Sequence, residues 1–92
     1  DEITRTVAKE EGVSVEELSS PSQRRLVSHA RSVIALIAVD YSEISVTEVA
    51  NHLSRHPTVI SRKLKQTREQ LYRRKREKGM VEHYLNLLNS QA

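Results

Sequence analysis

Four of the polar residues from 58 to 65 share one side of a predicted helix and have side chains of the kinds that contact nucleic acid. They are Thr58, Ser61, Arg62 and Lys65. Arg can form paired hydrogen bonds to guanine in the major groove, Thr and Ser can reach base edges or phosphates, and Lys neutralises phosphate. If Val59, Ile60 and Leu64 turn inward, the helical period places all four on one exposed face. We expect Arg62 to be the principal base reader.

The segment from 45 to 64 supplies a frame for these residues, because it has the arrangement of a helix-turn-helix. A capping box over Ser45 to Glu48 opens its first helix. Ala50 is small where the two helices would cross, so that their backbones can approach closely. Leu53 and Ile60 would fill the wedge between the helices. The segment therefore predicts a helix pair that presents its second helix to a ligand.

The predicted turn at 54–56 has the length of a sharp bend. Ser54 stands where Gly is usual, which costs free energy if the turn needs a left-handed backbone. Pro57 suits the first position of the second helix, where its missing amide proton would have no partner. The free amides at this helix start could hold a phosphate beside His56 and Thr58.

Helical periodicity also accounts for the rest of the chain. Further helices are predicted over 2–11, 15–19, 26–41 and 80–90, and the second helix of the pair is predicted to reach 78. Gly12 and Gly79 are expected to end helices, and Ser14 to Glu17 forms another capping box. The longest apolar series marks a central core helix and comprises Leu26, Val27, Ala30, Val33, Ile34, Ile37, Ala38 and Tyr41. We therefore predict an all-α fold of five to six helices.

Composition agrees with this fold and excludes several kinds of site. A chain of 92 residues is expected to form one domain, and its few Gly and Pro residues favour helices. Because the sequence has no Cys, disulfides, thiol nucleophiles and Cys-type zinc fingers are excluded. No apolar run reaches membrane-spanning length, and we expect no membrane partner and a cytoplasmic location.

The charge of the chain is divided between its two halves. Residues 1–48 carry five Lys and Arg against nine Asp and Glu, a net charge of −4, whereas residues 49–92 carry ten against three, a net charge of +7. Such a basic half attracts polyanions, because Lys and Arg near phosphates release condensed counterions. A basic, solvated helix face would give the same count, so charge alone does not decide between these interpretations.

Residues from about 3 to 71 resemble the carboxy-terminal DNA-binding domain of the bacterial replication initiator DnaA. The resemblance rests on ITRTVAKEEGVSVEELSS at 3–20 and on RRLVSHARSVIALIAVDYSEISVTEVANHLSRHPTV at 24–59. It implies a Trp-repressor-like helical fold, a loop at 22–25 that reaches the minor groove, and a backbone contact from Arg31. The family signature before its recognition helix, Arg-Asp-His-Thr-Thr-Val, corresponds to SRHPTV at 54–59.

The departures from this signature limit what the resemblance implies. Two Gly residues are missing, Arg55 replaces the acidic residue, Pro57 replaces a Thr, and Val39 stands where a Lys is expected. The initiator's own target sequence is therefore not expected. The continuation VISR at 59–62 is similar to the version of this domain found behind the catalytic domain of single-tyrosine transposases that act on repeat or hairpin elements.

Together these observations predict a bacterial, nucleoid-associated module that binds double-stranded DNA and is not catalytic by itself, with no cofactor or metal. The residues expected to contact DNA are Arg24, Arg25, Arg31, Arg55, His56, Pro57, Thr58, Ser61, Arg62 and Lys65. We expect a DNA-binding domain over 1–79 and an amphipathic helix over 80–92. That helix could pack on the domain or self-associate through Met80, Val81, Tyr84, Leu85 and Leu88. The alternatives are a fragment of a helical transcription regulator and a protein-interaction module.

Two kinds of chemistry are expected to be absent. His52 and His56 have the spacing of a metal-binding pair, but they straddle the predicted turn and no third ligand is near in sequence. A nucleophilic tyrosine would need a metal-binding pair of histidines beside it. We instead expect Tyr41 and Tyr84 in the core and Tyr72 at the surface. The basic run at 73–76 is expected to contact the DNA backbone.

Overall fold

The structure is a computed structural model that describes residues 2–22, 24–73 and 75–90, without the side chains of 71–73, 75–78 and 90. Its α-helices are α1 (Glu2–Glu11), α2 (Val15–Ser19), α3 (Arg25–Leu36), α4 (Val46–His52), α5 (Pro57–Arg73) and α6 (Lys75–Ser90). A π-helical turn, η1 (Ile37–Tyr41), continues α3. The predicted all-α architecture is confirmed. None of the helices described is long and apolar enough to cross a membrane.

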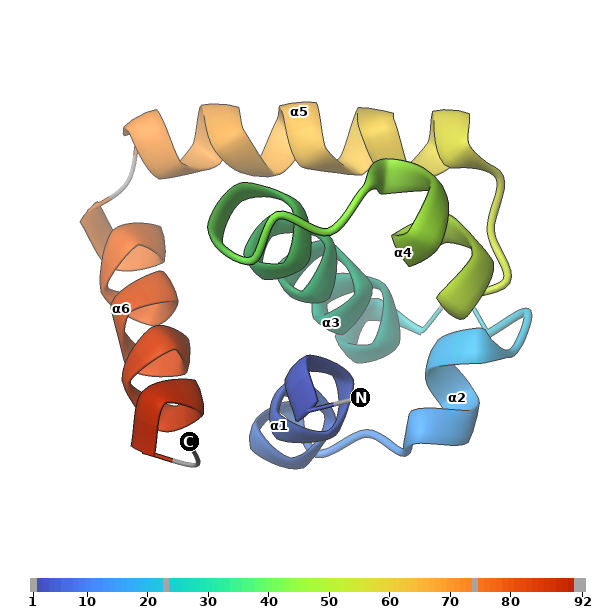
Figure 1. The fold of residues 1–92 in the computed structure, drawn as a ribbon, viewed down its shortest axis with the longest axis horizontal. Helices are drawn as coiled ribbons and strands as arrows, with labels where there is room; N and C mark the ends of the chain where they lie inside the picture. The colour runs from blue at the N-terminus through green and yellow to red at the C-terminus, as the bar shows by residue number, and fades with distance from the viewer. Residues whose placement is uncertain (1, 23, 74, 91–92) are drawn as a thin grey trace.

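Helix α3 runs through the middle of the molecule and is covered on several sides. In Figure 1 it is seen nearly end-on, with α5 above it, α1 below it, and α6 and α2 on either side. It contacts α1, α2 and α5 directly. Val33, Ile34 and Leu36 are almost completely buried on it. This arrangement explains why the helix is apolar on more than one face.

The ends of the first two helices follow the sequence closely. Gly12 has a left-handed backbone with φ of +72°, and the amide of Val13 donates to the carbonyl of Ala8 over 3.0 Å. This is the closing bond of a Schellman motif, so Gly12 ends α1 as predicted. The predicted capping box is also present, because the Ser14 hydroxyl accepts from the Glu17 amide and the Glu17 carboxylate accepts in return.

The end of the central helix differs from the prediction. Tyr41 was expected in the core but is 49% exposed. The π-helical turn has more residues per turn than an α-helix, which rotates Tyr41 away from the buried stripe. Leu26 is also 49% exposed, because it lies in the first turn of α3, ahead of the first buried position at Val27.

The boundary between the last two helices lies earlier than predicted. Helix α5 ends at Arg73 and α6 begins at Lys75, so Gly79 lies inside α6 instead of ending a helix. A glycine in a helix interior costs about 1 kcal/mol, which tertiary packing can offset. Here the packing comes from Val81 and Tyr84, which are 4% and 2% exposed.

Helix α6 packs on α1 and α5 of the same chain. The Tyr84 hydroxyl donates to Glu11 Oε1 over 2.6 Å, and His83 Nε2 lies 3.5 Å from Glu10 Oε2. Tyr84 is therefore a core residue, as predicted. Since Val81 and Tyr84 are buried within the chain, they are not available at the surface for the self-association expected of them.

Candidate nucleic-acid interface

Helices α4 and α5 form the predicted helix-turn-helix. Ala50 is fully buried where the helices cross, and Leu53 and Ile60 are fully buried between them. The Ser45 hydroxyl caps α4 by accepting from the Glu48 amide over 3.1 Å. Val59 was expected to point inward but is 38% exposed. It lies on the flank of α5, about 100° around the helix axis from Ile60.

The turn between the two helices requires a left-handed residue, and that residue is Ser54. Its φ is +54°, its amide donates to Asn51 O over 3.2 Å, and the amide of Arg55 donates to Ala50 O over 2.8 Å. These two bonds make a Schellman motif with Ser54 at the position where Gly is usual. The predicted strain at this position is therefore present.

His56 caps the start of α5. Its ring Nδ1 accepts from the Thr58 amide over 3.1 Å, and its carbonyl accepts from the amides of Val59 and Ile60. Pro57 is the first helical residue, as predicted. Because Nδ1 accepts, the proton of the neutral ring is on Nε2, which leaves an exposed donor beside the helix start.

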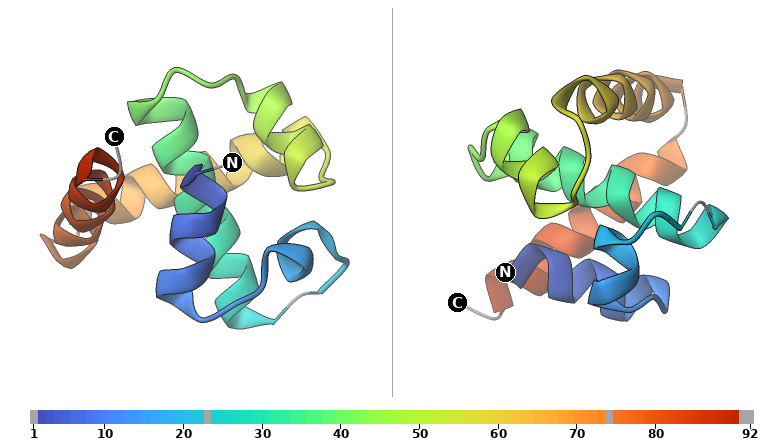
Figure 2. Two further views of the ribbon diagram at one scale, coloured as in Figure 1. Left: turned by 60° about the horizontal axis from the view of Figure 1, so that its bottom comes forward. Right: turned by 90° about the vertical axis from the view of Figure 1, so that its right-hand side faces the viewer.

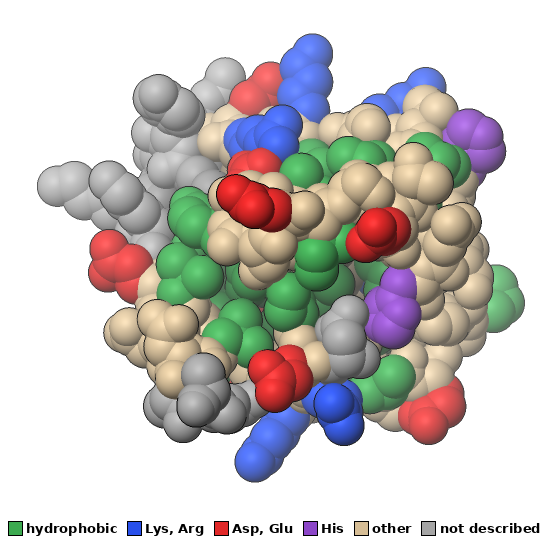
Figure 3. All heavy atoms as spheres, viewed as in Figure 1, with side chains coloured by type: hydrophobic (Ala, Val, Ile, Leu, Met, Phe, Trp, Pro, Cys, Tyr) green, Lys and Arg blue, Asp and Glu red, His purple; other side chains and the backbone are tan. Residues whose placement is uncertain are grey.

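The outward face of α5 has the composition expected of it. Thr58, Ser61, Arg62 and Lys65 are exposed, and Pro57 is half-buried. Figure 3 shows Lys and Arg side chains projecting along the edge formed by α5, while hydrophobic side chains gather in the middle of that view. Arg68 differs from Arg62, because it pairs with Asp40 of η1 through an Nε–Oδ2 contact of 2.9 Å.

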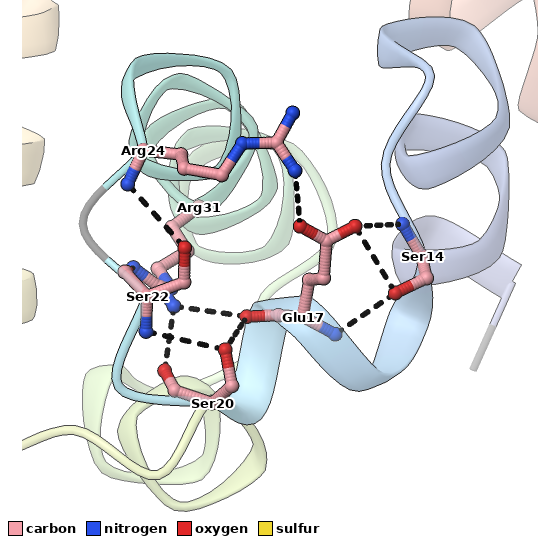
Figure 4. A network of polar contacts seen from close by, with 6 residues as sticks. All are labelled: Ser14, Glu17, Ser20, Ser22, Arg24 and Arg31. Atoms are coloured by element: carbon pink, nitrogen blue, oxygen red, sulfur yellow. Dashed lines mark hydrogen bonds and ion pairs between the residues drawn. The ribbon is translucent and has the colours of Figure 1, made fainter.

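Arg31 lies in the interior instead of at the surface. It is 3% exposed, and its guanidinium donates to backbone carbonyl oxygens of α2 and the α2–α3 loop. The acceptors are the carbonyls of Leu18 (2.9 Å), Ser22 (2.7 Å), Glu17 (3.0 Å) and Ser20 (2.7 Å). Figure 4 shows several of these contacts converging from α3 on the loop. Arg31 therefore binds the protein's own backbone and shapes the loop at 22–25.

Arg55 joins the helix-turn-helix to the same loop. Its Nη2 donates to the Ser20 carbonyl over 2.5 Å, the oxygen that Arg31 also binds. Figure 2 shows the α4–α5 turn beside the α2–α3 segment in its right-hand view. Burial, and secondarily the charge of Arg55, lower the pKa of Arg31. No local sequence pattern indicates this shared acceptor, because the bond joins residues 35 positions apart.

The basic loop residues described lie at the surface. Arg24 is exposed and pairs with Glu17 through an Nη1–Oε2 contact of 2.8 Å. Arg25, the first residue of α3, is exposed. Gln23, the second residue of the predicted minor-groove loop, lies outside the described residues, as does the side chain of Tyr72.

Sequence reasoning missed Lys63, which the structure places between α5 and α3. Its Nζ donates to Ser28 Oγ over 3.0 Å. Burial lowers the pKa of Lys63 most, and the nearby charges of Arg31 and Arg55 lower it further. Lys63 lies three residues after Ile60, on the flank of the helix. A solvated lysine and a half-buried one are both compatible with that position, so the sequence alone did not predict the contact with Ser28.

The two histidines with metal-binding spacing have separate partners. His52 Nε2 lies 2.9 Å from Thr4 Oγ1 of α1, whereas His56 caps α5. Within the described part of the chain, no three His, Cys, Asp or Glu residues are grouped as metal ligands.

The buried crossing, the Schellman turn and the exposed basic face define a helix-turn-helix of the kind that docks its second helix on DNA. The model of the family described as bacterial dnaA protein helix-turn-helix matches residues 1–66, and the chain belongs to this family. It is therefore a DNA-binding domain of the DnaA carboxy-terminal type, and such domains bind double-stranded DNA. No curated protein matches the chain. Helix α6 lies outside the matched residues.

Proposed function

We propose that this chain directs a larger protein to a duplex DNA site by gripping two grooves at once. The outward face of α5 enters the major groove, and the loop at 22–25 reaches the adjacent minor groove. The observation that carries this proposal is the exposed face of Thr58, Ser61, Arg62 and Lys65 on a helix whose opposite side is buried.

The network around Ser20 supports a two-part grip. Arg31 binds the α2–α3 loop from α3, and Arg55 binds it from the α4–α5 turn. The loop and the recognition helix are thus held at a fixed separation before DNA arrives. Such preorganisation favours binding, because less conformational freedom is lost when the complex forms.

The proposed roles follow from these positions. Arg62 reads a base, Ser61 and Thr58 meet base edges or phosphates, and Lys65 neutralises a phosphate. Pro57 and His56 lie at the helix start, where the His56 Nε2–H donates to a phosphate. Arg24 and Arg25 contact the minor groove or its flanking phosphates. Arg31 and Arg55 act through the shape of the loop.

The larger protein is proposed to be a single-tyrosine transposase that acts on repeat or hairpin elements. This rests on the resemblance of VISR at 59–62 to that version of the domain. A fragment of a transcription regulator is the competing parent. A protein-interaction module using α6 is less supported, because Val81 and Tyr84 of its apolar stripe are buried against the rest of the chain.

Fluorescence anisotropy tests the function. We expect the chain to bind random duplex and hairpin DNA in the micromolar range at low salt, with affinity that falls steeply as salt rises. Arg62→Ala should weaken a selected preferred site by about 1–3 kcal/mol and random duplex much less. Lys9→Ala, on the opposite side at α1, is the control and should change neither.

Two results would contradict the proposal. If neither DNA binds in the micromolar range at low salt, the chain does not act alone as a duplex-binding module. If Arg62→Ala weakens all duplexes equally, Arg62 contacts the backbone and does not read a base.

A further inference from the structure

A polar groove lies between the first half of α3 and the flank of α5. Its volume is about 430 Å³, and most of its lining side chains are hydrogen-bond donors or cations. The lining residues that matter here are Arg25, Ser28, His29, Lys63 and Gln66. Neither the family match nor the outward face of α5 accounts for this groove.

The chemistry of the groove favours an anion. Lys63 is half-buried, and its ammonium donates to the Ser28 hydroxyl. None of the lining residues that the structure describes carries a carboxylate, while Glu11 of α1 lies 3.7 Å from His29 of the lining. Burial lowers the pKa of Lys63 most, and the neighbouring charges of Arg31 and Arg55 oppose its charge and lower the pKa further. Crowding of like charges costs free energy in the free protein, and an anion bound among them would offset that cost.

The place of the groove indicates which anion it takes. It lies between Arg25, which ends the loop proposed for the minor groove and begins α3, and α5, whose outer face is proposed for the major groove. Two adjacent grooves of a duplex are separated by one sugar-phosphate strand. When a duplex contacts both the loop and α5, the strand between its two grooves therefore passes over the protein groove between α3 and α5.

We propose that the groove between α3 and α5 binds a phosphate of the DNA strand that separates the two contacted grooves, through Lys63, Arg25 and the Ser28 hydroxyl. This inference rests on the proposed function, since it needs the two-part grip. It adds a sequence-independent contact at a side chain that does not belong to the outward face. Lys63 is thus a phosphate ligand and not a base reader.

The test replaces Lys63 in the full chain and measures how affinity for a short random-sequence duplex depends on salt. Lys63→Met removes the charge but keeps the apolar stem. It should make the slope of log affinity against log salt less steep by about 1, the value expected for one lost phosphate contact. Lys63→Arg keeps the charge and should keep the slope. Lys9→Met, an exposed lysine on α1, is the matched control.

A stability measurement separates phosphate binding from a structural role. Because Lys63 is crowded by cations, the denaturation midpoint of free Lys63→Met should equal or exceed that of the wild type. A wild-type slope in Lys63→Met, or a loss of affinity explained by its unfolded fraction, would overturn the groove proposal. Failure of the wild type to bind any duplex would instead overturn the proposed function itself.

Discussion

The two ends of this molecule treat charge in opposite ways. Where α2, α3 and the α4–α5 turn meet, three cations, Arg31, Arg55 and Lys63, lie near one another, and the described contacts of their charged groups are to carbonyl and hydroxyl oxygens. Where α6 packs on α1, Glu10 and Glu11 face His83 and Tyr84. The three cations at the first end keep their positive charge, whereas at the second end His83 and Tyr84 are paired with the carboxylates of α1.

This difference distinguishes the residues expected to attract DNA from the residues that only stabilise the fold. Neutral carbonyl and hydroxyl oxygens accept the hydrogen bonds of the three cations without cancelling their charge, so the field around the loop and α5 stays attractive to phosphate. The α1–α6 contact closes the core and leaves no comparable excess of positive charge. Loss of the buried cation Arg31 at the first end should therefore lower stability and DNA binding together, whereas loss of a polar contact at the second end should lower stability alone.

The largest expected effect comes from Arg31→Met. It removes a buried guanidinium that donates to four backbone carbonyls. Of these, the Ser20 carbonyl keeps its bond from Arg55, and the Glu17 carbonyl keeps its bonds from Ser20. We expect the free energy of unfolding to fall by about 3 kcal/mol or more, because each lost bond to a charged group is worth about 1.5–3 kcal/mol and the bonds are not additive. Urea denaturation measures the loss, and anisotropy should show weaker binding to every duplex.

Arg25→Met is the control for this substitution. Arg25 is an exposed arginine on the same helix, so its loss should change stability by no more than about 0.5 kcal/mol. If Arg31→Met were as stable as Arg25→Met, the carbonyl network would not hold the loop. The first end would then lack the fixed geometry that the two-part grip requires.

Tyr84→Phe tests the second end. It removes the bond from the Tyr84 hydroxyl to Glu11 and should lower stability by about 1 kcal/mol at neutral pH, with no change in DNA affinity. Burial and then Glu11 raise the pKa of Tyr84 above its ordinary value. The stability that this tyrosine contributes is therefore fully present below about pH 10 and is lost as pH rises further, when the unfolded chain ionises first.

The free energy of unfolding, measured from pH 8 to above pH 10, tests this predicted direction of the pH dependence. The alkaline loss of stability should be smaller in Tyr84→Phe than in the wild type. Parallel pH profiles for the two proteins would show that the hydroxyl is not favoured in its protonated form. A loss of DNA affinity in Tyr84→Phe would remove the distinction between the two ends.

Local patterns in the sequence predicted most of the fold. Capping by Ser14 and Ser45, the left-handed Gly12 and the start at Pro57 each depend on residues a few positions apart, and all are present. The outward face of α5 followed from the helical period alone. These features could be predicted from the sequence because they depend on the geometry of residues close together in the chain.

The features that the sequence patterns did not reveal depend on contacts between distant segments. The burial of Arg31, the reach of Arg55 to Ser20 and the groove position of Lys63 each join segments 9 to 35 residues apart. The α5–α6 boundary was misplaced because packing of α6 on α1 outweighs the helix-breaking preference of Gly79. A single sequence shows which residues are basic, but not which of them the fold turns inward.

The smallest expected effect is a gain of stability at the turn of the helix-turn-helix. Ser54→Gly relieves a left-handed backbone with φ of +54° and should raise the free energy of unfolding by about 0.5–1 kcal/mol, because glycine adopts this conformation without a Cβ clash. Its side chain is exposed, and the Arg55 bond to Ser20 does not use it. DNA affinity should therefore stay unchanged while stability rises.

Two matched glycine substitutions make this prediction specific. Glu43 also has a left-handed backbone, with φ of +56°, so Glu43→Gly should stabilise the chain by a similar amount. Ser61 lies inside α5, and Ser61→Gly should destabilise it by up to about 1 kcal/mol. If Ser54→Gly stabilised the chain but weakened binding to every duplex, the strained turn would itself hold the recognition helix in register with the loop. The strained backbone at Ser54 would then contribute to DNA binding as well as to the fold.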